Sequence, residues 1–299
     1  MGTNRNNIDI SELAQLLDIE ETDLRETADA ASSMYWRRWD RSGKKPRYLC
    51  SPKGMLRVIQ NRIKEEILIN YKLPREIHGW RREHSTKTYT KPHIRRRSIV
   101  NIDIKDYYPS IKGWRIYNLW RSRGFSKPAA RLLTSLTTVD NQLPAGAPTS
   151  PCLGNHILVP LIKRVSKLAK IFDLNFTSYG DEIAVSGWRR VKKLKGLLLK
   201  ILRDEGFEIR PEKIKVMDSN DKQQLTGIVL NTTQSVGRDC YRNLRALLYN
   251  CVKYGPACQN RDNHPNFKEH LYGRIAQVAS VNAQQGMNLR KIFDMIVWD

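Results

Sequence analysis

The stretch NIDIKDYYPSI, residues 101–111, places one acidic residue, Asp103, at the end of a short apolar strand. A second stretch, SYGDEIAVSG at residues 178–187, has the pattern of two strands joined by a tight turn that carries Asp181 and Glu182. An ionised carboxylate beside hydrophobic strands is heavily penalised unless an opposite charge compensates it. A pair of Mg²⁺ ions would compensate it, because Mg²⁺ binds carboxylates together with substrate phosphates. Taken alone, Asp103 could equally cap a helix or pair with an arginine.

Five segments, two of which contain these carboxylates, follow one another in the chain: NIDIKDYYPSI (101–111), LPAGAPTSPCLGN (143–155), SYGDEIAVSG (178–187), EGFEIRPEKIK (205–215) and QLTGIVLN (224–231). In this order they resemble the successive palm motifs of reverse transcriptases. The similarity is greatest to bacterial retron reverse transcriptases and their antiphage defence relatives. It implies an α+β right-hand polymerase fold, with fingers, a palm built on an antiparallel sheet, and a helical thumb. The implied domains are residues 1–98 (N-terminal helices and fingers), 99–234 (palm, with finger helices at 112–140) and 235–299 (thumb).

The resemblance assigns the catalytic and metal-binding roles. It implies that Asp103 and Asp181 hold two Mg²⁺ ions, with the Ile104 carbonyl as a backbone ligand and Mn²⁺ as a possible substitute. Glu182 takes the place of the second Asp in the family's Tyr-x-Asp-Asp turn, and we expect activity to be retained. Two such ions can activate a 3′-hydroxyl and stabilise the leaving pyrophosphate.

The same resemblance predicts a nucleotide-binding pocket. Tyr108 takes the position of an aromatic ring that would clash with a ribose 2′-hydroxyl, so deoxynucleotides should be preferred. In the loop 143–150, Gly146 would let the backbone approach the template–nucleotide pair. Arg47 and Lys45 are candidates for the triphosphate, because arginine binds phosphate oxygens bidentately. The residues predicted to bind the nucleotide are Arg47, Asp106, Tyr107, Tyr108, Ala145, Gly146 and Lys213, the last near the pyrophosphate.

The charge of the chain predicts a polyanionic partner. Lysine and arginine number 52 against 30 acidic residues, which leaves 22 positive charges. This balance suits nucleic acid or an anionic surface. The resemblance narrows the partner to a structured non-coding RNA that serves as template and primer, with dNTPs and a DNA product. The residues predicted to contact nucleic acid are His93, Arg95, Arg96, Thr226, Gly227 and the thumb stripe Arg238, Arg242 and Arg245.

The remaining features predict a reduced, cytoplasmic protein without a membrane partner. No apolar run reaches 18 residues, and the start of the chain lacks a signal peptide's pattern. The five cysteines are scattered, which argues against a disulfide framework and a zinc site. A helix capped by Ser11 and a second one at 21–31 could be a helix-turn-helix, although packing is the favoured interpretation. Further expected elements are a hairpin at 41–52, helices at 114–122, 127–137, 151–169, 191–204 (with Gly206 as cap) and 237–254, and two strands within 175–187.

Three departures from the family keep an alternative open. Glu182 replaces Asp, Ala145 stands where glutamine is usual, and residues 89–93 match the retron signature only partly. The favoured hypothesis is an RNA-directed DNA polymerase that copies its RNA into single-stranded DNA. The resemblance adds priming from an RNA 2′-hydroxyl and antiphage defence beside an effector or toxin protein. The alternative is a catalytically degenerate, reverse-transcriptase-like RNA-binding scaffold.

Overall fold

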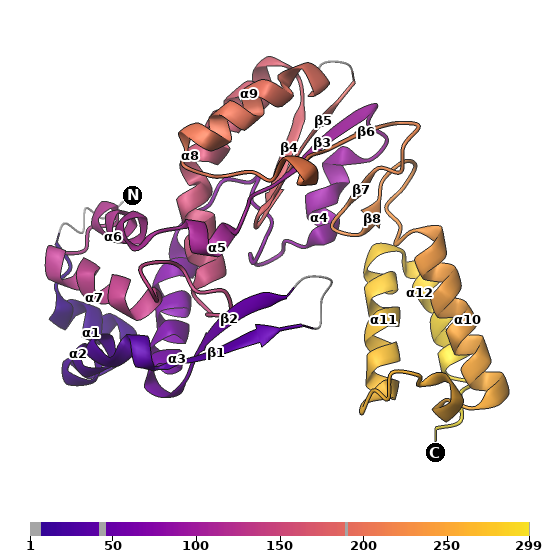
Figure 1. Cartoon of the computed structure of the whole chain (residues 1–299), viewed down its shortest axis with the longest axis horizontal. Helices are drawn as coiled ribbons and strands as arrows, with labels where there is room; N and C mark the ends of the chain where they lie inside the picture. Colours follow the sequence, from indigo (N-terminus) through magenta and orange to yellow (C-terminus); the bar gives the residue numbers. More distant parts are fainter. Residues whose placement is uncertain (1–6, 42–45, 189–190, 299) are drawn as a thin grey trace.

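The computed structural model describes residues 7–41, 46–188 and 191–298, and it forms three parts (Figure 1). Helices of the fingers lie at one end, a four-stranded sheet lies in the palm, and a helical thumb lies at the other end. The hairpin of β1 (Tyr35–Asp40) and β2 (Arg47–Pro52) extends from the fingers toward the thumb. No helix in the described part of the chain has the length and hydropathy that a membrane span requires. We use fingers, palm and thumb for the residue ranges given above.

The fingers are built from amphipathic helices. Their first helix begins at a capping box, in which the Glu12 N–H donates to the Asp9 side chain and the Asp9 N–H donates to the Glu12 side chain. Asp9 therefore caps this helix, and the prediction of Ser11 as the cap is wrong. The two N-terminal helices bury Leu13 and Leu24 in the main core, which supports packing rather than a free DNA-binding pair. The helical elements of the fingers, from this first helix onward, are α1 (Ile10–Leu17), α2 (Glu21–Ala30), η1 (Ala31–Ser33), α3 (Gly54–Arg62), η2 (Ile63–Ile67), η3 (Leu68–Asn70), α6 (Gly113–Ser122) and α7 (Lys127–Thr137).

The palm contains an antiparallel sheet with the strand order β4-β5-β3-β6. Its strands are β3 (Ser98–Asp103), β4 (Asn175–Tyr179), β5 (Glu182–Gly187) and β6 (Lys215–Asp218). The central pair β3 and β5 is almost fully buried, because α8 (Ser150–Ile171) and α9 (Val191–Asp204) pack against the sheet. Gly206 follows α9 with a φ of +77°, as expected of its C-terminal cap. The smaller palm elements are α5 (Tyr107–Ser110), η5 (Pro211–Lys213), β7 (Gln224–Leu225) and β8 (Ile228–Val229), and α4 (Thr86–Thr90) and η4 (Lys91–His93) of the fingers range lie beside β4.

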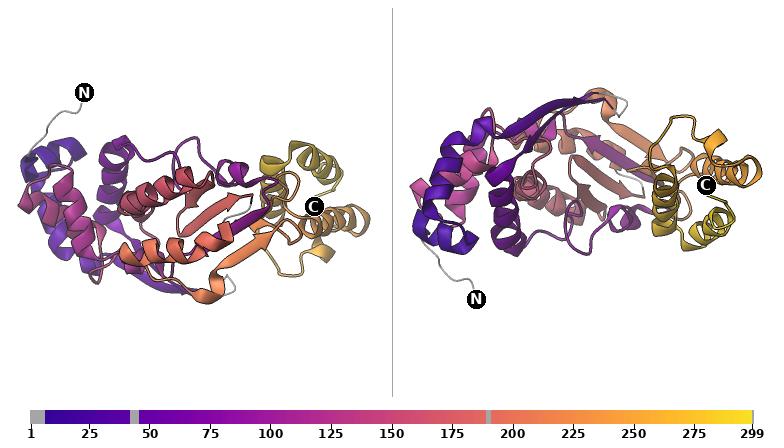
Figure 2. Two further views of the ribbon diagram at one scale, coloured as in Figure 1. Left: turned by 90° about the horizontal axis from the view of Figure 1, so that it is seen from above. Right: turned by 90° about the horizontal axis from the view of Figure 1, so that it is seen from below.

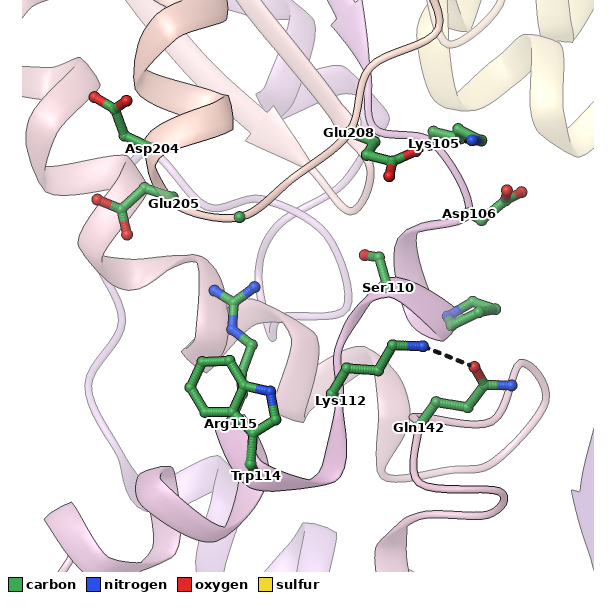
Figure 3. A pocket seen from close by; sticks show the side chains of 12 residues that line it. Lys105, Asp106, Ser110, Lys112, Trp114, Arg115, Gln142, Asp204, Glu205 and Glu208 are labelled. Atoms are coloured by element: carbon green, nitrogen blue, oxygen red, sulfur yellow. Dashed lines mark hydrogen bonds and ion pairs between the residues drawn. The ribbon is translucent and has the colours of Figure 1, made fainter.

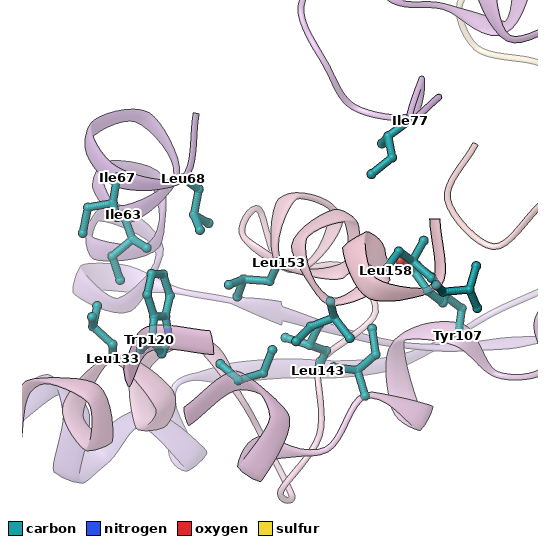
Figure 4. Packing of buried hydrophobic residues seen from close by; sticks show 14 of the residues in the cluster. Ile63, Ile67, Leu68, Ile77, Tyr107, Trp120, Leu133, Leu143, Leu153 and Leu158 are labelled. Carbon is teal, nitrogen blue, oxygen red and sulfur yellow. The ribbon is translucent and has the colours of Figure 1, made fainter. Parts of the chain in front are cut away.

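The main hydrophobic core joins the fingers to the palm (Figure 4). Trp120 of α6, Leu133 of α7, Ile63 of η2 and Leu153 of α8 are all fully buried in it. Leu153 lies just after the loop 143–150 that the sequence assigns to the nucleotide. The core therefore anchors this loop to the finger helices.

The thumb has a core of its own. It consists of α10 (Arg238–Tyr254), η6 (Ala257–Gln259), α11 (Phe267–Val281) and α12 (Ala283–Phe293). Apolar side chains of the three helices, among them Leu248, Leu271 and Leu289, form a cluster separate from the main core. Figure 2 shows this bundle set apart from the fingers, with the palm between them. A small third cluster, which includes Ile99, Leu225 and Val281, connects the bundle to the palm.

Candidate active site

Asp103 and Asp181 are brought together by neighbouring strands. Strands β3 and β5 pair antiparallel, with Asp103 opposite Glu182. The Ile104 N–H donates to the Asp181 carbonyl at 3.0 Å, which extends this pairing past the end of β3. The turn before β5 requires Gly180, whose φ is +60°. Two carboxylates that lie 78 positions apart in the sequence thus meet at one edge of the palm sheet.

The charges at this edge are only partly compensated. Burial raises the pKa of Asp181, and the charge of Asp103 raises it further. Lys213 Nζ lies 2.6 and 2.8 Å from the two carboxylate oxygens of Asp103. The charges of Lys213 and Arg47 oppose the rise in the pKa of Asp181. The site therefore combines two mutually repelling carboxylates with one directly bonded cation.

This donor set is compatible with Mg²⁺. Mg²⁺ usually keeps several waters and binds through one or two carboxylates plus substrate phosphates. Asp103 and Asp181 would supply these carboxylates, and the Ile104 backbone lies directly beside them. Within residues 7–41, 46–188 and 191–298, no group of three His, Cys, Asp or Glu side chains could hold a metal ion by itself. A bound substrate phosphate would therefore have to complete the coordination.

Glu182 lies next to these carboxylates in a more enclosed position. Burial raises its pKa to about 7, and the charges of Asp181 and Asp103 contribute to the rise. Its Oε2 is buried and has no hydrogen-bond partner among the described residues. A metal-binding role for Glu182 stays a prediction.

The loop 143–150 is held against the hairpin of the fingers. The Cys50 N–H of β2 donates to the Ala145 carbonyl at 2.7 Å. Gly146 has a φ of +112°, and a Cβ there would lie 3.0 Å from Ser51 Oγ. Position 146 therefore requires glycine, because β2 approaches closely and the backbone at this residue is left-handed. The sequence did not reveal this reason. Gly146, Ser51 and Tyr108 line a pocket of about 350 Å³.

The two neighbouring tyrosines have different environments. Tyr108 is half-buried and faces the pocket beside Gly146. Tyr107 is only 5% exposed and packs against Phe207, with 6.3 Å between the ring centroids. A Cβ on Gly154 of α8 would lie 2.8 Å from its hydroxyl. The prediction that Tyr107 binds the nucleotide is therefore wrong, because its side chain belongs to the core.

The remaining predicted nucleotide contacts lie at the rim of the site. Asp106 is exposed and forms an ion pair with Arg210 at 2.6 Å, so its carboxylate is already neutralised. Arg47 is exposed and close enough to Asp181 to affect its pKa. Lys45 lies outside the described residues. The structure does not test whether Arg47 or Lys213 binds phosphate.

His93 was predicted to contact nucleic acid, and its position in the structure contradicts this. The ring is fully buried against the palm sheet. Its Nδ1 lies 2.6 Å from Ser186 Oγ, and its Nε2 lies 2.7 Å from Thr177 Oγ1. Burial lowers the pKa of His93 to about 3, so the ring is neutral at physiological pH. His93 instead cross-links β4 and β5, the two strands that flank the Asp181 turn.

The other predicted nucleic-acid contacts lie on the surface or in turns. Arg95 and Arg96 donate through Nε to the carbonyls of Thr232 and Pro92, at 2.7 and 3.2 Å. Thr226 and Gly227 form the turn between β7 and β8, with φ values of +45° and +84°. On α10 the three predicted arginines are exposed and line one pocket of about 310 Å³. These arginines are Arg238, Arg242 and Arg245.

Sequence reasoning missed Trp80. Its backbone has a φ of +49°, which is rare for a bulky residue. The indole is 49% exposed, and its centroid lies 5.6 Å from that of Tyr179 and 6.3 Å from that of Tyr108. A Cβ on Gly180 would lie 2.5 Å from the Trp80 ring, so the glycine makes room for it. Trp80 therefore covers the turn that carries Asp181.

Comparisons with known proteins agree with this geometry. Residues 40–230 match the family model for reverse transcriptase (RNA-dependent DNA polymerase). The chain is 29% identical over 265 residues to the Retron Mx65 reverse transcriptase of Myxococcus xanthus. It is 26% identical over 251 residues to the Retron Ec86 reverse transcriptase of Escherichia coli. The resemblance to retron reverse transcriptases that the motifs predict is confirmed.

The comparisons also bear on the fold and on the extent of the match. A solved structure of telomerase from Candida albicans, with a fragment of telomeric RNA, aligns with 86% of this chain and 56% of that chain. The TM-score is 0.51 at 9% identity, and this likeness confirms the right-hand polymerase fold. The match to the Mx65 protein covers 82% of this chain and 60% of that relative. For the Ec86 protein the corresponding shares are 82% and 75%.

Proposed function

The chain belongs to the reverse transcriptase family, and from this membership we propose that it is an RNA-directed DNA polymerase of the retron type. It would add deoxynucleotides to a primer hydroxyl under the direction of an RNA template. The observation that carries the proposal is the meeting of Asp103 and Asp181 at the end of paired strands β3 and β5. The family match from residue 40 to residue 230 spans both carboxylates.

The residues of this site have distinct roles in the proposed reaction. Asp103 and Asp181 would hold two Mg²⁺ ions, which when bound supply activation of the primer hydroxyl and neutralisation of the leaving pyrophosphate. Lys213 holds Asp103 in place before substrate arrives, through its two contacts of 2.6 and 2.8 Å. Arg47, on the hairpin, would bind the triphosphate and bring the fingers toward the palm.

We expect this polymerase to select deoxynucleotides. Tyr108 and Gly146 both line the same pocket, and the Tyr108 ring has two aromatic neighbours, Tyr107 at 5.1 Å and Trp80 at 6.3 Å between ring centroids. A ring packed against two others cannot easily yield to a ribose 2′-hydroxyl. The comparison of dNTP and rNTP incorporation by the purified protein measures this selectivity, and Tyr108→Ala should reduce it.

The proposed template is a structured non-coding RNA that also provides the priming 2′-hydroxyl. This part rests on the similarity to retron reverse transcriptases and on the surplus of 22 positive charges. A role in antiphage defence, beside an effector protein, belongs to the same proposal. The exposed arginines of α10 would follow the backbone of the RNA or of the RNA–DNA duplex.

A second candidate, an RNA-binding scaffold without catalysis, is favoured by one observation. Lys213 already forms an ion pair with Asp103, at 2.6 Å, where the polymerase would need this carboxylate for a metal ion. The two candidates differ in the product that they make, because both bind RNA and only the polymerase forms DNA.

Primer extension distinguishes the two candidates. The full chain, purified with its bound RNA, is given dNTPs with Mg²⁺ or with Mn²⁺, and a generic primed RNA is tested in parallel. A polymerase makes DNA from both templates, and from its own RNA it makes a covalent RNA–DNA hybrid. Asp103→Asn should abolish DNA synthesis on both templates. Asp239→Asn, an exposed carboxylate of α10, is the matched control. Absence of DNA from both templates with both metals would leave the scaffold as the function.

A further inference from the structure

A cavity of about 770 Å³ lies beside the proposed catalytic site (Figure 3); its wall includes Asp106, which is predicted to bind the nucleotide, but neither Asp103 nor Asp181. Its walls are α5, the start of α6 and the segment that follows α9. Figure 3 shows the Lys112 and Arg115 side chains extending into the space between these elements. A volume of this size falls in the range of small-molecule sites.

Every carboxylate of the cavity wall already has a cationic partner. Asp106 is paired with Arg210 at 2.6 Å, and Glu208 with Lys105 at 2.8 Å. Asp204 and Glu205 both bind Arg164, each at 2.8 Å. The acidic side chains of the wall are therefore neutralised from outside the cavity or from its edge.

Two cations of the wall lack such a partner. Lys112 Nζ contacts only a neutral group, the Gln142 side-chain oxygen at 3.4 Å. The Arg115 guanidinium lies over the Phe207 ring at 4.6 Å from its centroid. In the described part of the chain, neither Lys112 nor Arg115 has a carboxylate within 4.0 Å. Burial lowers the pKa of Arg115, which fits a guanidinium with incomplete compensation.

The rim of the cavity adds an aromatic face. Trp114 is 63% exposed and lies between the two unpaired cations in the sequence. Helix α6 begins here without a side-chain cap, and its dipole favours an anion, although the Gly113 N–H donates to the Asn141 carbonyl and the Arg115 N–H to the Lys112 carbonyl. A phosphate suits the cations, and a flat base suits the indole, since bases stack on aromatic side chains.

We propose that this cavity is a second nucleotide-binding site, at which Lys112 and Arg115 hold the phosphate and Trp114 stacks on the base. The ligand is either a free nucleotide or one nucleotide of a bound RNA, and both share this chemistry. The site goes beyond the proposed polymerase function and does not depend on catalysis.

Binding to the full chain tests the proposal, with EDTA present so that metal-dependent binding at the catalytic carboxylates is suppressed. Adenosine monophosphate is titrated by calorimetry, and a single-stranded RNA decamer by fluorescence anisotropy. Lys112→Gln and Trp114→Ala should each weaken the binding of at least one probe about tenfold, as expected for one charged hydrogen bond or one stacked base. Lys127→Gln and Trp188→Ala are matched controls, because both side chains are exposed and lie outside the cavity lining.

The two probes identify the source of the nucleotide. If the cavity variants bind the monophosphate more weakly, the ligand is a free nucleotide. If they bind only the RNA more weakly, the ligand is one nucleotide of a bound RNA. Unchanged affinity of Lys112→Gln and Trp114→Ala for both probes would overturn the proposal. Asp103→Asn should bind both probes as tightly as the unmodified chain does. Loss of the proposed polymerase activity can therefore be distinguished from loss of binding at this cavity. Arg115 is left unchanged, because its contact with Phe207 also supports packing.

Discussion

Replacement of His93 by leucine tests whether this residue is structural. The Thr177 hydroxyl donates to the Tyr89 carbonyl at 3.0 Å, so its single proton is committed. Thr177 must therefore accept from His93 Nε2–H, and Nδ1 accepts from the Ser186 hydroxyl. Leucine removes both bonds and leaves the buried Ser186 hydroxyl without an acceptor. One lost hydrogen bond and one orphaned donor together predict a loss of about 2–4 kcal/mol in the free energy of unfolding.

The pH dependence of the free energy of unfolding gives a second test of the same variant, with an expected magnitude of its own. The pKa of His93 is lowered to about 3 in the folded chain, against a usual value of 6.5. Below pH 6.5 the unfolded chain therefore binds a proton that the folded chain does not, and stability falls by up to about 1.4 kcal/mol per pH unit. His93→Leu lacks this effect. The stability difference between the two proteins should therefore shrink by about 2–3 kcal/mol from pH 6.5 to pH 4.5.

Hydrogen exchange of the β4 and β5 amides, corrected for intrinsic rates, measures these changes in the palm itself. Lys127→Gln, which replaces an exposed side chain of α7, is the control and should change stability by less than about 0.5 kcal/mol. Under conditions where both proteins are folded, His93→Leu should bind RNA as tightly as the unmodified chain. Unchanged exchange together with weaker RNA binding would refute the structural role and restore a direct nucleic-acid contact.

Three further substitutions probe the site and the thumb. Gly180→Ala places a Cβ 2.5 Å from the Trp80 ring, at a residue whose φ is +60°. Nucleotide addition in single-turnover primer extension should therefore slow at least about tenfold. An unaffected rate would show that the turn tolerates displacement of Trp80. Lys213→Gln removes the cation bonded to Asp103, which competes with a metal ion for this carboxylate. Mn²⁺ should therefore bind several-fold more tightly in paramagnetic resonance titrations without nucleotide. Weaker binding would contradict this competition. Arg242→Gln should reduce the log–log salt slope of RNA binding by about 0.7–0.9, and an unchanged slope would remove this arginine from the phosphate contacts.

The edge of the palm that carries Asp103 and Asp181 was predictable as structure because it depends on local pattern. Apolar strands that end in an acidic residue or a tight turn place both residues at strand ends, and antiparallel pairing brings such ends together. The strands within 175–187 and the thumb helix near 237–254 were predictable from hydrophobic periodicity, and the structure contains them as β4, β5 and α10. The resemblance to a family then supplied the roles that pattern alone cannot assign.

Other features depend on contacts that the sequence does not encode locally. His93 is surrounded in the sequence by lysines and arginines, yet its ring is fully buried against the palm sheet. Tyr107 and Tyr108 are adjacent and identical, so only the packing of Gly154 decides which one is core. The ion pair of Asp106 with Arg210 spans 104 positions in a chain that has many arginines, and no spacing rule selects this partner.

Metal-directed backbone cleavage tests the central assignment most directly. Fe²⁺ replaces Mg²⁺ in the full chain, and with ascorbate and oxygen it generates radicals that cut the nearest peptide bonds, which mass spectrometry identifies. A cation shared by the two strand ends predicts cuts in both 102–105 and 180–183, prevented by excess Mg²⁺ and lost in Asp103→Asn. Cleavage confined to one of these segments, or located elsewhere in the chain, would contradict a joint metal site.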